Sequence, residues 1–192
     1  MKKLNLKFLV IAVGLTFTAG AMAQGMSKEG YMSGMAKIKS DYSANKTACS
    51  SQSGNQKDIC LVEAKGMRNV AKAELEFSYK PTAKKQYNVK VAKAEAQYSV
   101  ANERCDDLGG NAKDVCVKEA KAVRASSKAD AKVQLKVSEA NKKARNRKAD
   151  ARNEAVSDKV DANFAVAKEK CDKFTGSAKD DCLMEAKTRY SK

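Results

Sequence analysis

A stretch bounded by two cysteines occurs three times in this chain and constrains its fold more than any other feature. The copies run from Cys49 to Cys60, from Cys105 to Cys116 and from Cys171 to Cys182. In each copy a glycine stands five positions after the first cysteine, Lys-Asp follows at the eighth and ninth positions, and Glu-Ala-Lys begins three positions after the second cysteine. We therefore expect the same local structure three times.

The residues between the cysteines predict a short turn between two antiparallel helices. The glycine suits the left-handed conformation that ends a helix. The residue after it, asparagine or serine, is a good N-cap, and the aspartate three positions later favours the positive end of the next helix. The expected turns lie at Gly54, Gly110 and Gly176, with N-caps at Asn55, Asn111 and Ser177.

Each cysteine pair is expected to form a disulfide across its own turn. The two cysteines of a copy would lie at nearly equal depth on facing helices, and local pairing is the simplest of the 15 ways to join six cysteines. A zinc site would normally use closely spaced cysteines or histidine, and a redox site would normally use Cys-x-x-Cys. The chain has neither spacing and no histidine. Structural disulfides of an exported protein explain the six cysteines best.

An aromatic residue stands seven positions before the first cysteine of each copy, at Tyr42, Tyr98 and Phe164. Seven residues are two helical turns, so each ring shares a helix face with its cysteine. A row of rings facing a ligand is one interpretation. Core packing inside each hairpin is the one we expect.

The first 23 residues are typical of a secretory signal. Lys2 and Lys3 precede an apolar run of ten from Phe8 to Phe17, and Ala21-Met22-Ala23 is a small-x-small cleavage site. The run is too short to span a bilayer, which takes about 20 apolar residues. We expect a periplasmic or secreted protein that begins at Gln24, carries no lipid anchor and has no transmembrane segment after cleavage.

The composition predicts helices with a thin core. The formal net charge is +15, or +12 without the three lysines of the leader. Leu, Ile, Val and Phe supply 23 of the 169 residues that follow the leader, below the fraction of roughly 20 percent at which charged chains are usually disordered. Alanine, lysine, arginine and glutamate favour helix because their side chains lose little rotamer freedom there. Three disulfides would help such a chain to fold.

These patterns predict an all-α fold of three disulfide-stapled antiparallel helical hairpins, forming an elongated bundle or a repeat array. Lys80-Pro81 ends a helix, since the residue before proline avoids the helical region. Between the second and third copies, ten additional residues leave either a bend near 138–146 or a straight helix, and we expect the bend. The expected segments are a flexible arm at 24–34, hairpins at 35–80, 81–137 and 153–192, and a basic linker or helix continuation at 138–152.

The densest charge of the chain lies in that last segment. Arginine and lysine can bind phosphates there through charge-assisted contacts and counterion release. A solvated helix or an exposed bend has the same composition. Because no aromatic residue is interleaved, the cluster is a poor stacking platform for single-stranded nucleic acid. The candidate polyanion-binding residues are Lys142, Lys143, Arg145, Arg147, Lys148 and Arg152.

The recurring pattern Cys-x4-Gly-x2-Lys-Asp-x-Cys-x2-Glu-Ala-Lys, set among Ala/Lys-rich helices, resembles a set of exported Gram-negative bacterial proteins, some labelled TolA-like or cell-envelope proteins. The resemblance covers about Lys37 to Lys192, and the likeness to TolA lies in the composition of that protein's long helical middle region. A stapled helical hairpin is also similar to the twin Cys-x9-Cys proteins, although here the spacing is one residue longer and each hairpin has one staple. No catalytic or binding residue carries over.

Export, helical structure and positive charge together predict a non-enzymatic structural or interaction protein of the cell envelope. Expected partners are anionic, such as lipopolysaccharide, peptidoglycan, teichoic-like polymers or acidic proteins. Nucleic-acid or polyanion binding is one alternative, and a periplasmic stress holdase is another. The chain has no nucleophile beside a base, no cluster of metal ligands and no phosphate-binding glycine loop, so we expect no catalytic residues, metal or cofactor.

Overall fold

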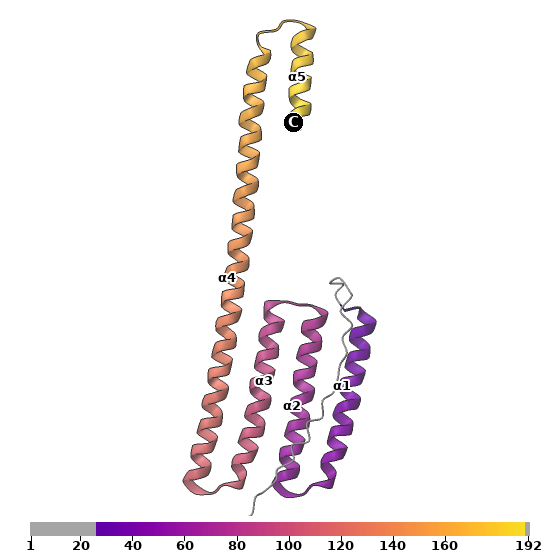
Figure 1. The fold of residues 1–192 in the computed structure, drawn as a ribbon, viewed down its shortest axis with the longest axis vertical. Coiled ribbons are helices and arrows are strands. Elements are labelled where there is room, and N and C mark those ends of the chain that lie inside the picture. Colours follow the sequence, from indigo (N-terminus) through magenta and orange to yellow (C-terminus); the bar gives the residue numbers. More distant parts are fainter. Residues whose placement is uncertain (1–25, 191–192) are drawn as a thin grey trace, which may run out of the picture.

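The computed structural model describes residues 26–190, which form five α-helices (Figure 1). The first three are α1 (Lys28–Ala48), α2 (Gly54–Tyr79) and α3 (Ala83–Arg104), and they are followed by α4 (Gly110–Cys171) and α5 (Ser177–Tyr190). Short 3-10 turns at Cys49–Ser51 and Cys105–Asp107 follow α1 and α3. The prediction of an all-α fold of three stapled hairpins is confirmed. The expected leader, at residues 1–23, lies outside the described residues.

The helices form a single row rather than a closed bundle. α1, α2, α3 and the first part of α4 lie side by side and antiparallel, and each packs on the next one along the chain (Figure 1). The second part of α4 extends well beyond this row, and α5 folds back along its far end. Both α3 and α5 lie on the same side of α4 (Figure 1).

The flexible arm expected at 24–34 is wrong over most of its length, because α1 already begins at Lys28. The Ser27 hydroxyl accepts a hydrogen bond of 3.0 Å from the Gly30 backbone N–H and so caps the helix. Gly34 lies within α1, and the absence of a side chain there lets α2 come close. A Cβ atom at position 34 would stand 2.7 Å from Cδ1 of Leu75.

The bend expected near 138–146 is also wrong, since α4 continues without a break for 62 residues. At a rise of about 1.5 Å per residue, the helix is about 93 Å long. Residues 138–152 contain no glycine or proline and are rich in alanine, lysine and arginine, so this segment has no strong helix breaker. Of the two alternatives for 138–152, helix continuation is therefore the correct one.

The turns have the expected glycine conformation but different caps. Gly54, Gly110 and Gly176 have φ values of 54°, 55° and 59°. The expected N-caps at Asn55 and Asn111 are wrong, because Ser53 and Gly109 occupy the cap positions without a side-chain hydrogen bond.

The core consists mainly of cysteine and alanine, as the composition predicts. The first cysteine of each pair is buried, and so are Ala64, Ala120 and Ala186, which are the alanines of the three Glu-Ala-Lys motifs. Small side chains let neighbouring helices approach closely but bury little apolar area. The disulfides therefore carry a large share of the stability.

Candidate interaction surfaces

Each expected disulfide is present. Cys49 bonds to Cys60, Cys105 to Cys116 and Cys171 to Cys182, with Cα–Cα distances of 5.6, 5.7 and 5.7 Å. No cysteine is free. Each disulfide joins the end of one helix to the first turns of the next, so it fixes the depth at which the two helices of a hairpin pack.

In each hairpin, the aromatic residue before the first cysteine packs on the residue that stands eight positions after the second cysteine. The Arg68 guanidinium lies 4.5 Å from the centre of the Tyr42 ring, and the Arg124 guanidinium lies 4.0 Å from that of Tyr98. In the third hairpin, the rings of Phe164 and Tyr190 are 6.2 Å apart. Each ring thus packs against the other helix of its own hairpin, which is the packing that we expected. The partners were not predicted, although their constant spacing in the sequence would have revealed them.

Ion pairs bridge two of the three turns. Lys113 and Asp106 are 2.8 Å apart, and Lys179 and Asp172 are also 2.8 Å apart. The hydrogen bond to its aspartate raises the pKa of each lysine above its ordinary value. The first turn has Ser50 where the other two have aspartate, so it lacks this pair.

Between α3 and α4, one carboxylate meets two cations. Glu95 accepts a hydrogen bond of 2.7 Å from Lys128 and one of 3.4 Å from Arg124. The hydrogen bond from Lys128 is the main cause that lowers the pKa of Glu95 below its ordinary value. Because Arg124 also covers Tyr98, these contacts form one small network across the second hairpin.

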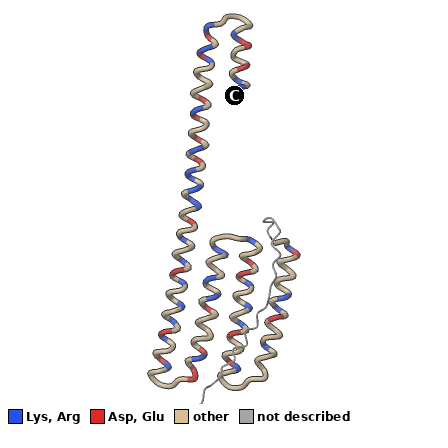
Figure 2. The backbone as a smooth tube through the Cα atoms, in the orientation of Figure 1, with Lys and Arg blue, Asp and Glu red and all other residues tan. Residues whose placement is uncertain are grey.

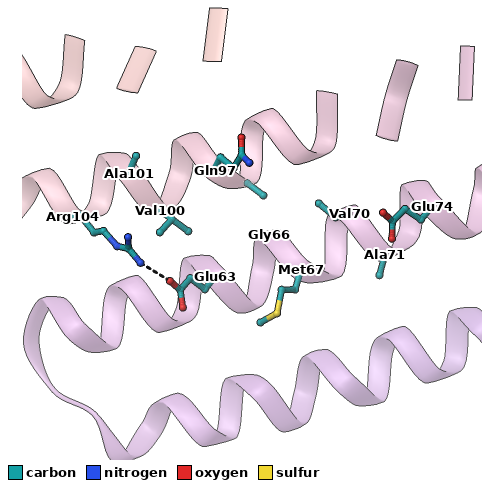
Figure 3. Close-up of a pocket in the computed structure, with 11 residues that line it drawn as sticks. Glu63, Gly66, Met67, Val70, Ala71, Glu74, Gln97, Val100, Ala101 and Arg104 are labelled. Atoms are coloured by element: carbon teal, nitrogen blue, oxygen red, sulfur yellow. Dashed lines mark hydrogen bonds and ion pairs between the residues drawn. The ribbon is translucent and has the colours of Figure 1, made fainter. Parts of the chain in front are cut away.

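The interface between α2 and α3 joins the first hairpin to the second. Three ion pairs cross it: Glu63 with Arg104 at 3.1 Å, Glu74 with Lys93 at 2.7 Å, and Glu76 with Lys85. The first of them is drawn in Figure 3. In all three pairs the acid belongs to α2 and the base belongs to α3.

Two further contacts fix the register of this interface. Nδ2 of Asn55 donates a hydrogen bond of 3.1 Å to the Glu103 carbonyl. Gly66 and Ala96 bring the two backbones together, because a Cβ atom at position 66 would lie 2.9 Å from the Ala96 Cβ atom. Side chains close to this contact line an open groove of about 590 Å³ between α2 and α3 (Figure 3). Its apolar lining comprises Met67, Val70, Ala71, Ala96, Val100 and Ala101.

The candidate polyanion-binding residues lie on the part of α4 that packs against no other helix. Every residue from Glu139 to Lys159 is exposed. Figure 2 shows basic positions following one another along this stretch. Successive residues turn by about 100°, so the cations point in several directions around the helix. Lys142, Lys143, Arg145, Arg147, Lys148 and Arg152 therefore form a cationic collar, and Asp150 is the one acid between Lys142 and Arg152.

Comparison with protein-family models, with curated proteins and with solved structures found no match. Within residues 26–190, no helix has both the length and the hydrophobicity needed to cross a membrane. The same residues contain no group of histidine, cysteine, aspartate and glutamate side chains arranged to hold a metal ion.

Proposed function

We propose that this chain is an exported, non-enzymatic helical protein that binds anionic polymers or lipids of the cell envelope through its cationic collar, residues 142–152. One observation carries the proposal: the collar lies on a single helix that no other element covers, so its six basic side chains are accessible from all sides. The disulfides and the leader-like N-terminus support an oxidising compartment, the periplasm or the exterior of the cell.

The geometry suits repeated phosphates or carboxylates better than one small anion. The six cations span about 15 Å of helix, and no pocket encloses them. Binding of this kind releases counterions and weakens steeply as salt is added.

The test compares two variants with the same change in net charge. In the collar variant, Lys142, Lys143, Arg145, Arg147, Lys148 and Arg152 become glutamine, which keeps a good helix propensity. In the control variant, six exposed lysines of the four-helix row become glutamine: Lys28, Lys39, Lys46, Lys57, Lys65 and Lys72. We expect the collar variant to lose most of its binding to phosphatidylglycerol vesicles and to lipopolysaccharide, and the control variant to lose little. Equal losses in both variants would contradict a localised site.

Nucleic acid is the alternative polyanion for the same collar. A DNA duplex in the same salt series separates the two functions, since only the phosphate backbone would be recognised in it. Tighter binding to DNA than to envelope lipids at every salt concentration would favour the nucleic-acid function.

A holdase is the second candidate function, and the exposed apolar groove favours it. Met67 in the groove between α2 and α3 and Val123 beside α3 are 55% and 60% exposed. Such surface can bind unfolded clients. Met67→Lys would then reduce suppression of client aggregation, whereas Met32→Lys on the equally exposed Met32 of α1 would not.

A further inference from the structure

One face of α4 is uncovered along the whole helix. Since α3 and α5 pack on the same side, the opposite side has no neighbour among the described residues (Figure 1). Val115, Val133 and Val166 are 46%, 61% and 53% exposed. We call this side the free face, and it includes Val115, Ala122, Ala129, Val133, Ala162 and Glu169.

The free face has a covered counterpart in the same molecule. Cys105 follows Cys49 by 56 positions, and Cys171 follows Cys105 by 66. By these shifts, the first part of α4 corresponds to α2, and the second part of α4 corresponds to α3. In the row, α3 covers this side of α2, whereas nothing among residues 26–190 covers the equivalent side of α4.

Two of the three ion pairs between α2 and α3 have equivalents of the same sign on α4, whereas Glu76 and Lys85 correspond to Lys132 and Ala151. Glu63 and Arg104 correspond to Glu119 and Lys170, and Glu74 and Lys93 correspond to Asp130 and Lys159. The four side chains on α4 are exposed. None of them belongs to an ion pair that the structure shows among residues 26–190.

The contacts that set the register have equivalents too. Asn55, which donates to the Glu103 carbonyl, corresponds to Asn111, and Glu103 corresponds to Glu169. The close contact of Gly66 with Ala96 corresponds to Ala122 and Ala162, again two small residues. The free face therefore carries most of both halves of an interface like that between α2 and α3.

The first and third hairpins have other residues at the equivalent positions. At the positions of Asn55, Ile59 and Gly66, the third hairpin has Ser177, Asp181 and Thr188. At the position of Arg104, the first hairpin has Ala48. Terminal repeats of an array typically carry such polar or truncated replacements. The second hairpin instead keeps Asn111, Val115 and Ala122, as an internal repeat does.

The same chain cannot bring the two halves together. Ala122 and Ala162 are 40 residues apart on one straight helix, or about 60 Å. We propose that two copies of this chain associate through their free faces with α4 antiparallel, so that the first part of each α4 receives the third hairpin of the other copy. Each end of the dimer would then contain three consecutive hairpins, completed by exchange of the third.

A single register satisfies both ion pairs that have equivalents on α4. The midpoint between Glu119 and Lys170 falls between Ala144 and Arg145, and so does the midpoint between Asp130 and Lys159. The midpoint of Ala122 and Ala162 is Lys142, close by. A two-fold axis near these residues forms each contact twice, once at each end of the helix pair.

The interface would be more charged than its counterpart within the chain. Val62, which lies in the interface of α2 and α3, corresponds to Lys118, and Ala92 corresponds to Asp158. We therefore expect reversible association. The inference rests on the equivalence of the hairpins and not on the proposed binding of polyanions. The two-fold axis lies within the collar, so the collars of the two copies lie side by side in the dimer.

Cross-linking tests the partner and the register together. All native cysteines form disulfides, so a thiol-specific cross-linker reacts only with the new thiols of Ala122→Cys/Ala162→Cys. We expect a covalent dimer. The control Ala122→Cys/Ala151→Cys lies on the same face, but one thiol is shifted by eleven residues, about 16 Å, and it should not cross-link. A cross-link within one chain would mean that the third hairpin folds onto its own α4. That result, or no cross-link at all, would overturn the proposal.

Charge reversal tests the specific contacts by sedimentation over a concentration series. Glu119→Lys and Lys170→Glu should each raise the dissociation constant roughly tenfold, because each change occurs twice per dimer. Combining them should return it to within about threefold of the wild-type value. If the wild-type chain stays monomeric, or if the double variant is no better than the single variants, the proposed pairing is wrong.

Val115→Asp gives the second hairpin the residue that the third has at Asp181. Val115 is 46% exposed, so folding should tolerate the change while association weakens at least tenfold. Val123→Asp is the matched control, because Val123 is 60% exposed but lies beside α3. Equal association of Val115→Asp, Val123→Asp and the wild-type chain would exclude the free face as the interface.

Discussion

Gly66 of α2 lies so close to Ala96 of α3 that a Cβ atom at position 66 would stand 2.9 Å from the Ala96 Cβ atom and 3.4 Å from the Ala96 Cα atom. No flexible side chain can move out of the way at this point. The distance between the first and second hairpins is therefore set by the absence of a side chain at position 66.

Gly66→Leu should separate α2 from α3 and lower the free energy of unfolding by about 1–3 kcal/mol through overpacking. Urea unfolding monitored by circular dichroism measures the effect. Lys72→Leu on the exposed side of the same helix is the control, and it should change stability by less than about 0.5 kcal/mol. Similar stabilities of the two variants would show that the hairpins do not depend on this contact.

Gly110→Ala should destabilise the second hairpin by about 1 kcal/mol through backbone strain alone. Its φ of 55° disfavours any residue with a Cβ atom, although nothing lies within 4 Å of the place that the Cβ would occupy. Gly109→Ala is a matched control, because its φ of −123° suits alanine and its surroundings are also open. Thermal unfolding should give Gly110→Ala the lower midpoint of the two variants. A lower midpoint for Gly109→Ala would refute the strain argument.

Glu95→Gln should lower stability at neutral pH by less than about 1 kcal/mol, since the carboxylate is partly exposed. The pKa of Glu95 is lowered in the folded chain, so its contribution is present above the unfolded pKa and is lost as the pH falls through the folded pKa. The gap between wild type and variant should therefore close in acid. Urea titrations from neutral to acidic pH measure it. Glu154→Gln, in the uncovered part of α4, should show no such gap.

Replacing Cys171 and Cys182 with serine should unfold α5 locally and leave the four-helix row intact. The chain-entropy model gives about 3 kcal/mol for a loop of this length. A helix of 14 residues that is held mainly by one disulfide has marginal stability without that disulfide. Amide hydrogen exchange should show lost protection in α5 and unchanged protection in α1, α2 and α3. Loss of protection throughout would mean that the third hairpin supports the whole chain.

Ala144→Pro should kink α4 without destabilising the row. Proline costs a helix interior about 3 kcal/mol, but residues 139–159 pack against no other element of the described chain. We expect a smaller maximum dimension in small-angle X-ray scattering and an unchanged unfolding midpoint of the four-helix row. A large drop in that midpoint would reveal contacts that bridge the two parts of α4.

The hairpins were predictable from the sequence because strong local signals repeat three times. Glycine at the turn, cysteines at matched depth and aromatic residues two turns earlier all indicate the same structure. The errors lie where local signals are weak. Gly30 and Gly34 resemble a flexible arm, yet Gly34 allows α1 to approach Leu75. Residues 138–146 contain asparagine and serine, but their neighbours favour helix strongly enough to keep α4 straight.

The candidate surfaces were less predictable because they depend on packing between hairpins. The cationic collar is visible as a run of charges, but its accessibility follows only from an unbroken α4. The pairing of Glu63 with Arg104 joins residues 41 positions apart, and no local pattern indicates it. The free face becomes apparent only when the covered side of α2 is compared with the uncovered side of α4.

The unbroken helix also fixes the rotation of the third hairpin relative to the other two. One residue inserted between Ser138 and Lys148 would turn α5 by about 100° around α4, whereas seven residues would turn it by about 20° and move it outward by about 10 Å. Evolution can therefore lengthen this rod in steps of about seven or eleven residues and keep both hairpins on the same side. Any other change in length would rotate one hairpin out of phase with the rest of the molecule.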